Sequence, residues 1–306
     1  MKTIRLVLLV LVAFAFTSPA DVKLEYTFKV GDEYTWSQLT KQTIKQSFGG
    51  MEQNIENNIE GEMNLKVKAL TPNGAEIETT FTRLKHTMTS PQMNSVMDSE
   101  GADDKMENKI FKALLNKPFS LFLTKLGKIE KVENMENLWS GLSGLGLDEN
   151  ELAARKQSLQ QMFGESAIKS GFEQAFVTYP ENKVKPGDTW KVTVTPPMNF
   201  PLSLENTWSF TGVEGNAAKL TADGVATTSD KEKAISLPGG LKAKIDLGGK
   251  QAMKSSIDTK SGWPTKLDMM SELKGKMILL AGGPIPEDMD IPMEIFSENS
   301  FTMKKK

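Results

Sequence analysis

The sequence predicts an α+β protein made mainly of antiparallel β-sheet in two related halves, with a central helical segment packing on the sheet. Long runs of alternating apolar and polar residues occupy both ends of the chain, as in residues 63–69 and 267–281. Between these runs, apolar residues within 99–176 recur at helical spacing. Strands and helices that are segregated in this way favour an antiparallel α+β fold over a parallel βαβ fold.

A short repeated segment is the third observation behind this fold class. It reads VGDEYTW at residues 30–36 and KPGDTW at residues 185–190. Glycine and aspartate favour a turn, and the aromatic residue after them is expected to pack inward from the strand that follows. The repeat predicts one unit over residues 21–178 and a second over 179–306. The helical stretch has no counterpart in the second unit, so the repeat concerns the strands alone.

Residues 1–20 have the pattern of a secretory signal peptide. Lys2 and Arg5 precede an apolar stretch at 6–16, and Ser18 and Ala20 supply the small residues that a signal peptidase reads. The alternative is a membrane anchor, but the stretch is shorter than the roughly 20 residues that span a bilayer. We therefore expect cleavage after Ala20, export to the periplasm or the medium, and no stable membrane span afterwards.

Residues 22–84 predict strands. Residues 63–69 alternate between apolar and polar, the sequence TPNG at 71–74 favours a turn, and residues 75–82 alternate again. This pattern is typical of an antiparallel hairpin.

The middle of the chain predicts helices on either side of two short strands. A helix over 99–116 must end before Pro118, because proline cannot continue it. Residues 119–124 and 128–132 predict the two strands. A second helical stretch covers 135–176, in which Asp148 and Glu151 form a candidate capping box.

The second half predicts strands over 190–194, 204–212, 217–228, 241–247 and 267–281, with a hairpin turn at 214–216 and a further strand that follows Gly248 and Gly249 and runs to about residue 258. A strand over 267–281 would extend roughly 50 Å, so we expect it to bend or break at Gly275. Residues 287–290 lie between Pro286 and Pro292 and predict a solvated loop. The three terminal lysines predict a solvated tail.

Composition excludes several classes of function. Cleavage would leave 35 basic residues against 39 acidic ones, whereas nucleic-acid binding requires a basic face. The chain has no cysteine and one histidine, which leaves no ordinary zinc site and no usual base for a nucleophile. We expect His86 to have a structural or surface role. The sequence also has no nucleotide-binding loop. From these observations together we expect no cofactor, no metal and no catalytic residue.

Methionine is the compositional feature that points towards binding, because its side chain adapts to irregular apolar space. Several methionines lie at inward strand positions or on the expected helix face, namely Met63, Met106, Met162, Met269 and Met277. They are either ordinary core residues or part of a deformable apolar cavity between sheet and helices. The candidate lining residues of such a cavity are Leu65, Val67, Leu267, Met269 and Leu273.

Three segments carry a family resemblance: LGKIEKV at 126–132, VKPGDTW at 184–190 and IDTKSGWP at 257–264. Through them the chain resembles an uncharacterised family of exported bacterial proteins of the Bacteroidota type, over most of residues 24–281. Many of those relatives look like lipoproteins, whereas this chain lacks the cysteine that would accept a lipid. The pattern is also similar to periplasmic lipoprotein carriers, in which a curved sheet wraps helices around an apolar cavity.

Three functions remain open from the sequence. The first is a non-catalytic envelope protein that binds an apolar or amphipathic, lipid-like ligand between sheet and helices. The second is a structural or protein-interaction module of the envelope, with another envelope protein as partner. The third is a hydrolase that uses two facing carboxylates.

Overall fold

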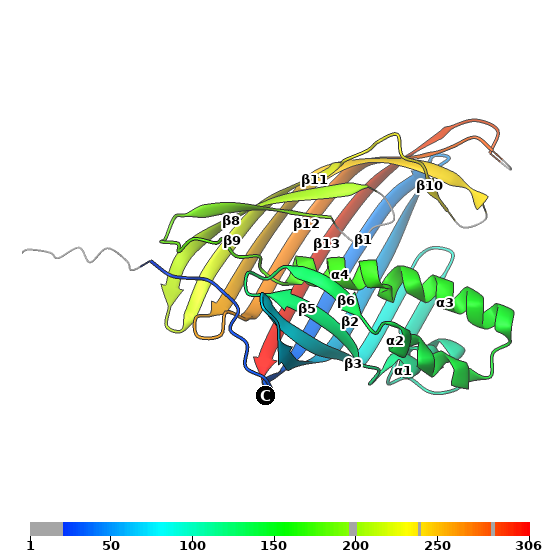
Figure 1. Ribbon diagram of the computed structural model, residues 1–306. Helices are drawn as coiled ribbons and strands as arrows, with labels where there is room; N and C mark the ends of the chain where they lie inside the picture. The colour runs from blue at the N-terminus through cyan, green and yellow to red at the C-terminus, as the bar shows by residue number, and fades with distance from the viewer. Residues whose placement is uncertain (1–20, 196–200, 238–239, 283–284) are drawn as a thin grey trace, which may run out of the picture.

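One antiparallel sheet of 13 strands dominates the protein (Figure 1). The computed structural model describes residues 21–195, 201–237, 240–282 and 285–306. The predicted signal peptide, residues 1–20, lies outside this range. Strands account for 56% of the described residues and helices for 16%, so the predicted α+β class is wrong and the fold is mostly antiparallel β. The predicted helical stretch holds only short helices and two strands, whereas the other strands reach 20 residues in length.

The strands before the helices are β1 (Glu33–Phe48), β2 (Met51–Leu70), β3 (Gly74–Thr89), β4 (Asn94–Asp98), β5 (Phe119–Thr124) and β6 (Ile129–Glu133). Those after the helices are β7 (Thr189–Val194), β8 (Leu202–Glu214), β9 (Ala217–Thr228), β10 (Ile235–Ser236), β11 (Lys242–Asp258), β12 (Pro264–Leu279) and β13 (Met289–Lys305).

The strand order is β6-β5-β3-β2-β1-β13-β12-β11-β9-β8-β7, with β4 beside β3 and β10 beside β11. The first and last strands of the chain are therefore neighbours in the middle of the sheet. Their antiparallel ladder runs from the Tyr34–Lys305 pair to the Gln46–Met293 pair. A division into two units at residue 178 stays a prediction, and the sheet continues through both stretches.

The helices lie on one side of the curved sheet (Figure 1). They are α1 (Met106–Leu114), α2 (Glu136–Ser140), a 3-10 helix (Gly141–Leu145), α3 (Glu149–Phe163) and α4 (Glu165–Ala175). The predicted cap of α3 is confirmed, because the Asp148 side chain accepts a hydrogen bond of 2.8 Å from the Glu151 backbone N–H. Among the described helices, none is long and apolar enough to cross a membrane.

The largest error of the sequence interpretation concerns the end of the chain. Residues 289–290 of the predicted loop and 304–305 of the predicted lysine tail belong to a strand, β13, at the centre of the sheet. Pro292 and the polar inward residues Ser297 and Asn299 interrupt its apolar alternation, and proline is unusual in a central strand. Of the bend or break predicted at Gly275, the break is wrong, because β12 continues through this residue. The predicted interruption at Gly248 and Gly249 is wrong as well, because β11 runs through both glycines.

The repeated segment forms the same local structure twice. Gly31 has a φ of 90° and Gly187 a φ of 96°, and each is the third residue of the turn, 29–32 or 185–188, that leads into β1 or β7. The backbone N–H of Gly31 donates to the Val67 carbonyl at 2.9 Å, and that of Gly187 donates to the Phe210 carbonyl at 2.8 Å. The hairpins β1–β2 and β7–β8 thus start from equivalent positions.

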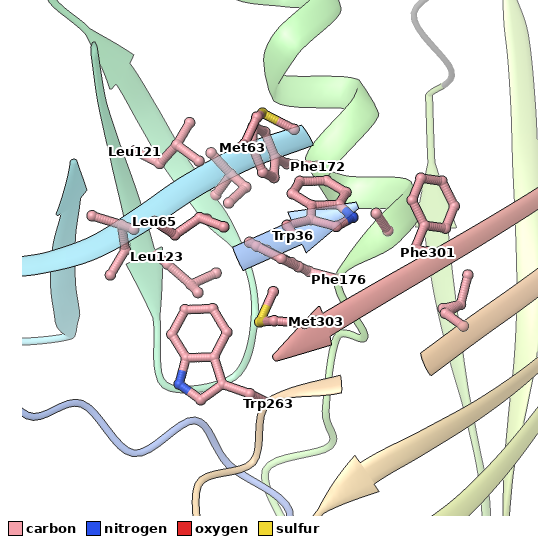
Figure 2. Packing of buried hydrophobic residues seen from close by; sticks show 14 of the residues in the cluster. Trp36, Met63, Leu65, Leu121, Leu123, Phe172, Phe176, Trp263, Phe301 and Met303 are labelled. Atoms are coloured by element: carbon pink, nitrogen blue, oxygen red, sulfur yellow. The ribbon is translucent and has the colours of Figure 1, made fainter. Parts of the chain in front are cut away.

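An aromatic core closes the helical end of the sheet (Figure 2). It comprises Tyr26, Phe28, Tyr34, Trp36, Phe172, Phe176, Tyr179, Trp263 and Phe301. Tyr34 and Trp263 stack with ring centroids 4.5 Å apart, and Trp36 meets Phe172 of α4 at 4.4 Å. Such pairs add roughly 0.5–1.5 kcal/mol each to the free energy of area burial. This core therefore fixes α4 against the sheet.

The segment before β1 ties the aromatic core to two turns of the sheet. The backbone N–H of Tyr26 donates to the Lys125 carbonyl in the β5–β6 turn, and that of Thr27 donates to the Ser261 carbonyl in the β11–β12 turn, both at 2.8 Å. Tyr26 is 1% exposed, so the segment contributes to the interior as well as to the hydrogen bonding.

Gly262, in the β11–β12 turn, should tolerate no side chain. Its φ is 71°, and a Cβ there would overlap the carbonyl oxygen of Glu25. We expect Gly262→Ala to lower the free energy of unfolding by about 2 kcal/mol or more, measured by urea unfolding of residues 21–306. Gly171→Ala in α4 is the control and should raise it by roughly 0.5–1 kcal/mol, because its Cβ meets open space. Equal stability of Gly262→Ala and the unmodified protein would contradict the close contact between Gly262 and the Glu25 carbonyl.

Candidate functional site

The inner face of the sheet, which points towards the helices, carries almost no charge. We define it on the seven strands β2, β1, β13, β12, β11, β9 and β8, where residues alternate between the two faces. Among the described residues, the exception is Lys305, exposed at the end of β13, whose Nζ lies 2.6 Å from Asp32. No other inner position on these strands holds Asp, Glu, Lys or Arg.

The charged residues of these strands lie on the outer face, where many form cross-strand ion pairs. Lys66 and Glu33 are 2.7 Å apart, and Lys276 and Asp290 are 2.6 Å apart. Exposed pairs of this kind contribute only about 0–1 kcal/mol each. Their main effect is on register, because a slip by one residue would carry every such charge to the inner face.

One row of register partners crosses the inner face with uncharged polar residues and one glycine. This set is termed the polar row: Asn57 (β2), Gln42 (β1), Ser297 (β13), Ser271 (β12), Gln251 (β11), Gly224 (β9) and Asn206 (β8). Because antiparallel partners lie opposite each other, these residues form a continuous stripe across seven neighbouring strands.

Three hydrogen bonds link side chains within the polar row. Asn57 Nδ2 donates to Gln42 Oε1, Gln42 Nε2 donates to Ser297 Oγ, and Gln251 Nε2 donates to Asn206 Oδ1, each at 3.3 Å. A Cβ on Gly224 would overlap Asn206 Oδ1, so this glycine makes room for the amide pair. Each primary amide offers two donor hydrogens and two acceptor lone pairs, so these bonds leave capacity for a further partner.

An apolar row lies on the side of the polar row away from the aromatic core. It lies on the inner face and is termed the outer apolar row because it is farther from the aromatic core. Its members are Ile55, Ile44, Ile295, Leu273, Gly249, Ala226 and Leu204. Its buried members belong to a second hydrophobic cluster, which contains no described residue of the helices. The helices therefore fill one end of the inner face, and the outer apolar row lies at the other end.

The row on the core side of the polar row is mixed. It contains Met269 and Trp208 of the main core together with Thr40, whose hydroxyl donates to Asn299 Oδ1 at 2.7 Å. The polar row thus separates the filled end of the inner face from the outer apolar row.

Exposure to solvent changes along the polar row. Asn206, Gln251 and Ser297 are 4%, 5% and 7% exposed, whereas Gln42 and Asn57 on β1 and β2 are only half-buried. Ile44 and Ile55 of the outer apolar row are half-buried as well. Ser271 on β12 is half-buried too. The polar row and the outer apolar row are thus both partly open to solvent over β1 and β2.

The predicted lining residues fall in two different places. Leu65, Val67, Leu267 and Met269 lie in the main core, and Leu267 borders a space of only about 10 Å³ beside Trp36. Leu273 lies in the outer apolar row. Their role in lining a ligand cavity stays a prediction.

Sequence reasoning missed the polar row. Its members lie on seven different strands, and only the register shows that they lie side by side. The prediction that Met162 lies on the packed face of a helix is wrong, because its side chain is 38% exposed on α3. His86 lies opposite Ile59 beside this face, and burial lowers the pKa of its imidazole, so it adds no charge at neutral pH.

Residues 72–264 match the model of a family of unknown function, DUF6263. The chain belongs to this family. The match to DUF6263 includes all three segments that carry the resemblance described above, at 126–132, 184–190 and 257–264. A search of the curated proteins finds no match.

Among solved structures, this DUF6263 member is similar to part of lipovitellin, in a structure that describes lipid–protein interactions. The TM-score is 0.53 at 11% identity, over 91% of this chain and 25% of lipovitellin. The chain thus spans about a quarter of the matched structure, and the likeness concerns the fold. An outer membrane channel from Pseudomonas putida F1 gives a TM-score of 0.28 at 9% identity, covering 92% of this chain and 97% of the channel. That score is too low to support any inference.

His86 should make the stability of the protein depend on pH. Its pKa is lowered in the folded state, so the unfolded state binds a proton near pH 6.5 that the folded state does not. Stability is therefore lost as the pH falls through that value. We expect a smaller drop in Tm between pH 7.5 and pH 5.5 for His86→Gln than for the unmodified protein. Glu173, whose pKa burial raises, is present in both proteins. An equal drop in both would contradict the burial of the imidazole.

Proposed function

We propose that the protein is exported and holds an apolar or amphipathic ligand against the inner face of its sheet, without performing catalysis. The observation that carries this proposal is the inner face itself. It is uncharged, the helices fill only one end of it, and Ile44 and Ile55 are half-buried at the other end. A concave apolar surface with a few polar groups is the usual form of a small-molecule site.

The physical argument concerns the half-buried apolar residues. Met277 and Met293 are also half-buried and pack against the second cluster beside Ile44. Burial of apolar surface contributes about 25 cal/mol per Å², so covering these side chains would favour binding. Methionine suits such a surface because its side chain repacks around different ligand shapes.

Two further observations support the proposal. The sequence of residues 1–20 has the pattern of an export signal. The fold is similar to part of lipovitellin, whose structure describes lipid–protein interactions. Fold similarity alone does not assign a ligand, and it makes a lipid-like ligand the first class to test.

The outer face favours a second candidate, an interaction module of the cell envelope. Leu39, Phe296 and Met270 are 41%, 41% and 51% exposed on the adjacent strands β1, β13 and β12. Leu39 and Met270 line a shallow hollow of about 250 Å³. Charged residues surround them, so the apolar area is divided, and we rank this candidate below ligand binding.

Binding of the uncharged probe N-phenyl-1-naphthylamine tests the two candidates against each other. We expect a saturable rise in its fluorescence with the unmodified protein. Ile44→Gln removes apolar contact from the inner face and should raise the Kd about five-fold, equivalent to about 1 kcal/mol. Thr43→Gln is the matched control, because the neighbouring residue points to the outer face beside Phe296.

The control variant should bind the probe like the unmodified protein. No saturable binding would reject the proposed function. A weaker affinity in Thr43→Gln with an unchanged affinity in Ile44→Gln would move the site to the outer face and support the second candidate.

A further inference from the structure

We infer that the polar row binds the headgroup of a neutral amphiphile and that the row discriminates against ionised headgroups. This inference rests on the proposed function and names its ligand class. Hydroxyl, ester or amide groups of the ligand would lie against the polar row, and its hydrocarbon chain would lie along the outer apolar row next to it.

The first argument is the lack of a counter-charge. An ionised group that leaves water needs an opposite charge or several hydrogen bonds to replace its hydration. Lys305, the one charged residue described on the inner face, is eight residues from Ser297 on β13. This separation is about 27 Å along an extended strand. His86 is kept neutral by burial. An anion or a cation at the polar row would therefore find no opposite charge on the inner face around it.

The second argument is the chemistry of the row. Each primary amide presents two donors and two acceptor lone pairs, and each hydroxyl presents one donor and two acceptor lone pairs, which matches hydroxyl, ester and amide groups. Gln42 shows both functions, because its Oε1 accepts from Asn57 and its Nε2 donates to Ser297. An anion can use only the donors, and the carbonyl oxygens of the same amides would face it with like partial charge.

The third argument is position. Gln42 and Asn57 are neighbouring half-buried members of the row, and the half-buried Ile44 and Ile55 lie two residues away on the same two strands. Polar and apolar groups thus stand next to each other where the inner face is most exposed. A headgroup and the first part of a hydrocarbon chain would meet both.

Two ligands with the same C18 chain test this inference by displacing N-phenyl-1-naphthylamine. One is 1-monooleoylglycerol, which is neutral, and the other is oleyl sulfate, which is a permanent anion. Both are used below the concentration at which they aggregate. We expect the neutral ligand to displace the probe at a concentration at least ten-fold lower.

The double variant Gln42→Leu/Asn57→Leu removes both amides and keeps the approximate volume of the side chains. We expect it to bind the probe and to reduce the preference for the neutral ligand to three-fold or less. The matched control Thr43→Leu/Asn58→Leu changes the next residue on each strand, which points to the outer face. It should keep the full preference. If the double variant does not fold, as judged by circular dichroism, Gln42→Met replaces it with an expected loss of about three-fold.

The outcomes separate this inference from the proposed function. Absence of probe binding rejects the proposed function. Probe binding with equal displacement by the anion and the neutral ligand, or with no displacement by either, rejects the neutral headgroup site and leaves the apolar site in place. A preference that survives loss of both amides would show that the row has only a structural role.

Discussion

The structure depends on keeping one uncharged face of a single antiparallel sheet away from water. The described strands form one sheet with no second sheet packed on this face, so curvature, helices and side chains must cover it. The alternation of residues along strands of up to 20 residues sends the charges of the central strands to the outer face. The ladder between β1 and β13 fixes that register at the centre of the sheet.

The two ends of this face are covered in different ways. At one end the aromatic core joins α4, the segment before β1 and the β11–β12 turn, with Trp263 stacked on Tyr34. At the other end, the second cluster is built from strand residues, and Ile44 and Ile55 remain half-buried. The polar row lies between these two ends. The end that is packed by the aromatic core and the end where we propose that a ligand binds are thus different parts of one continuous surface.

The sequence contains enough information for the hairpins and the cap of α3, because both depend on contacts within a few residues, as at Asp148 and Glu151. It was misleading for β13, since Pro292, Ser297 and Asn299 are polar or irregular locally and are accommodated only between β1 and β12. The polar row could not be predicted from the strands one at a time. Its members are separated by up to 255 residues in the chain, as between Gln42 and Ser297, and they meet through register alone.

Native mass spectrometry of the protein purified from its own host, followed by extraction and identification of any bound small molecule, tests the central claim most directly. The account predicts a population whose mass exceeds that of the chain by one amphiphile, and the extracted molecule should carry an uncharged headgroup. A chain that emerges with its bare mass under gentle ionisation, or one that releases an ionised lipid, would contradict it.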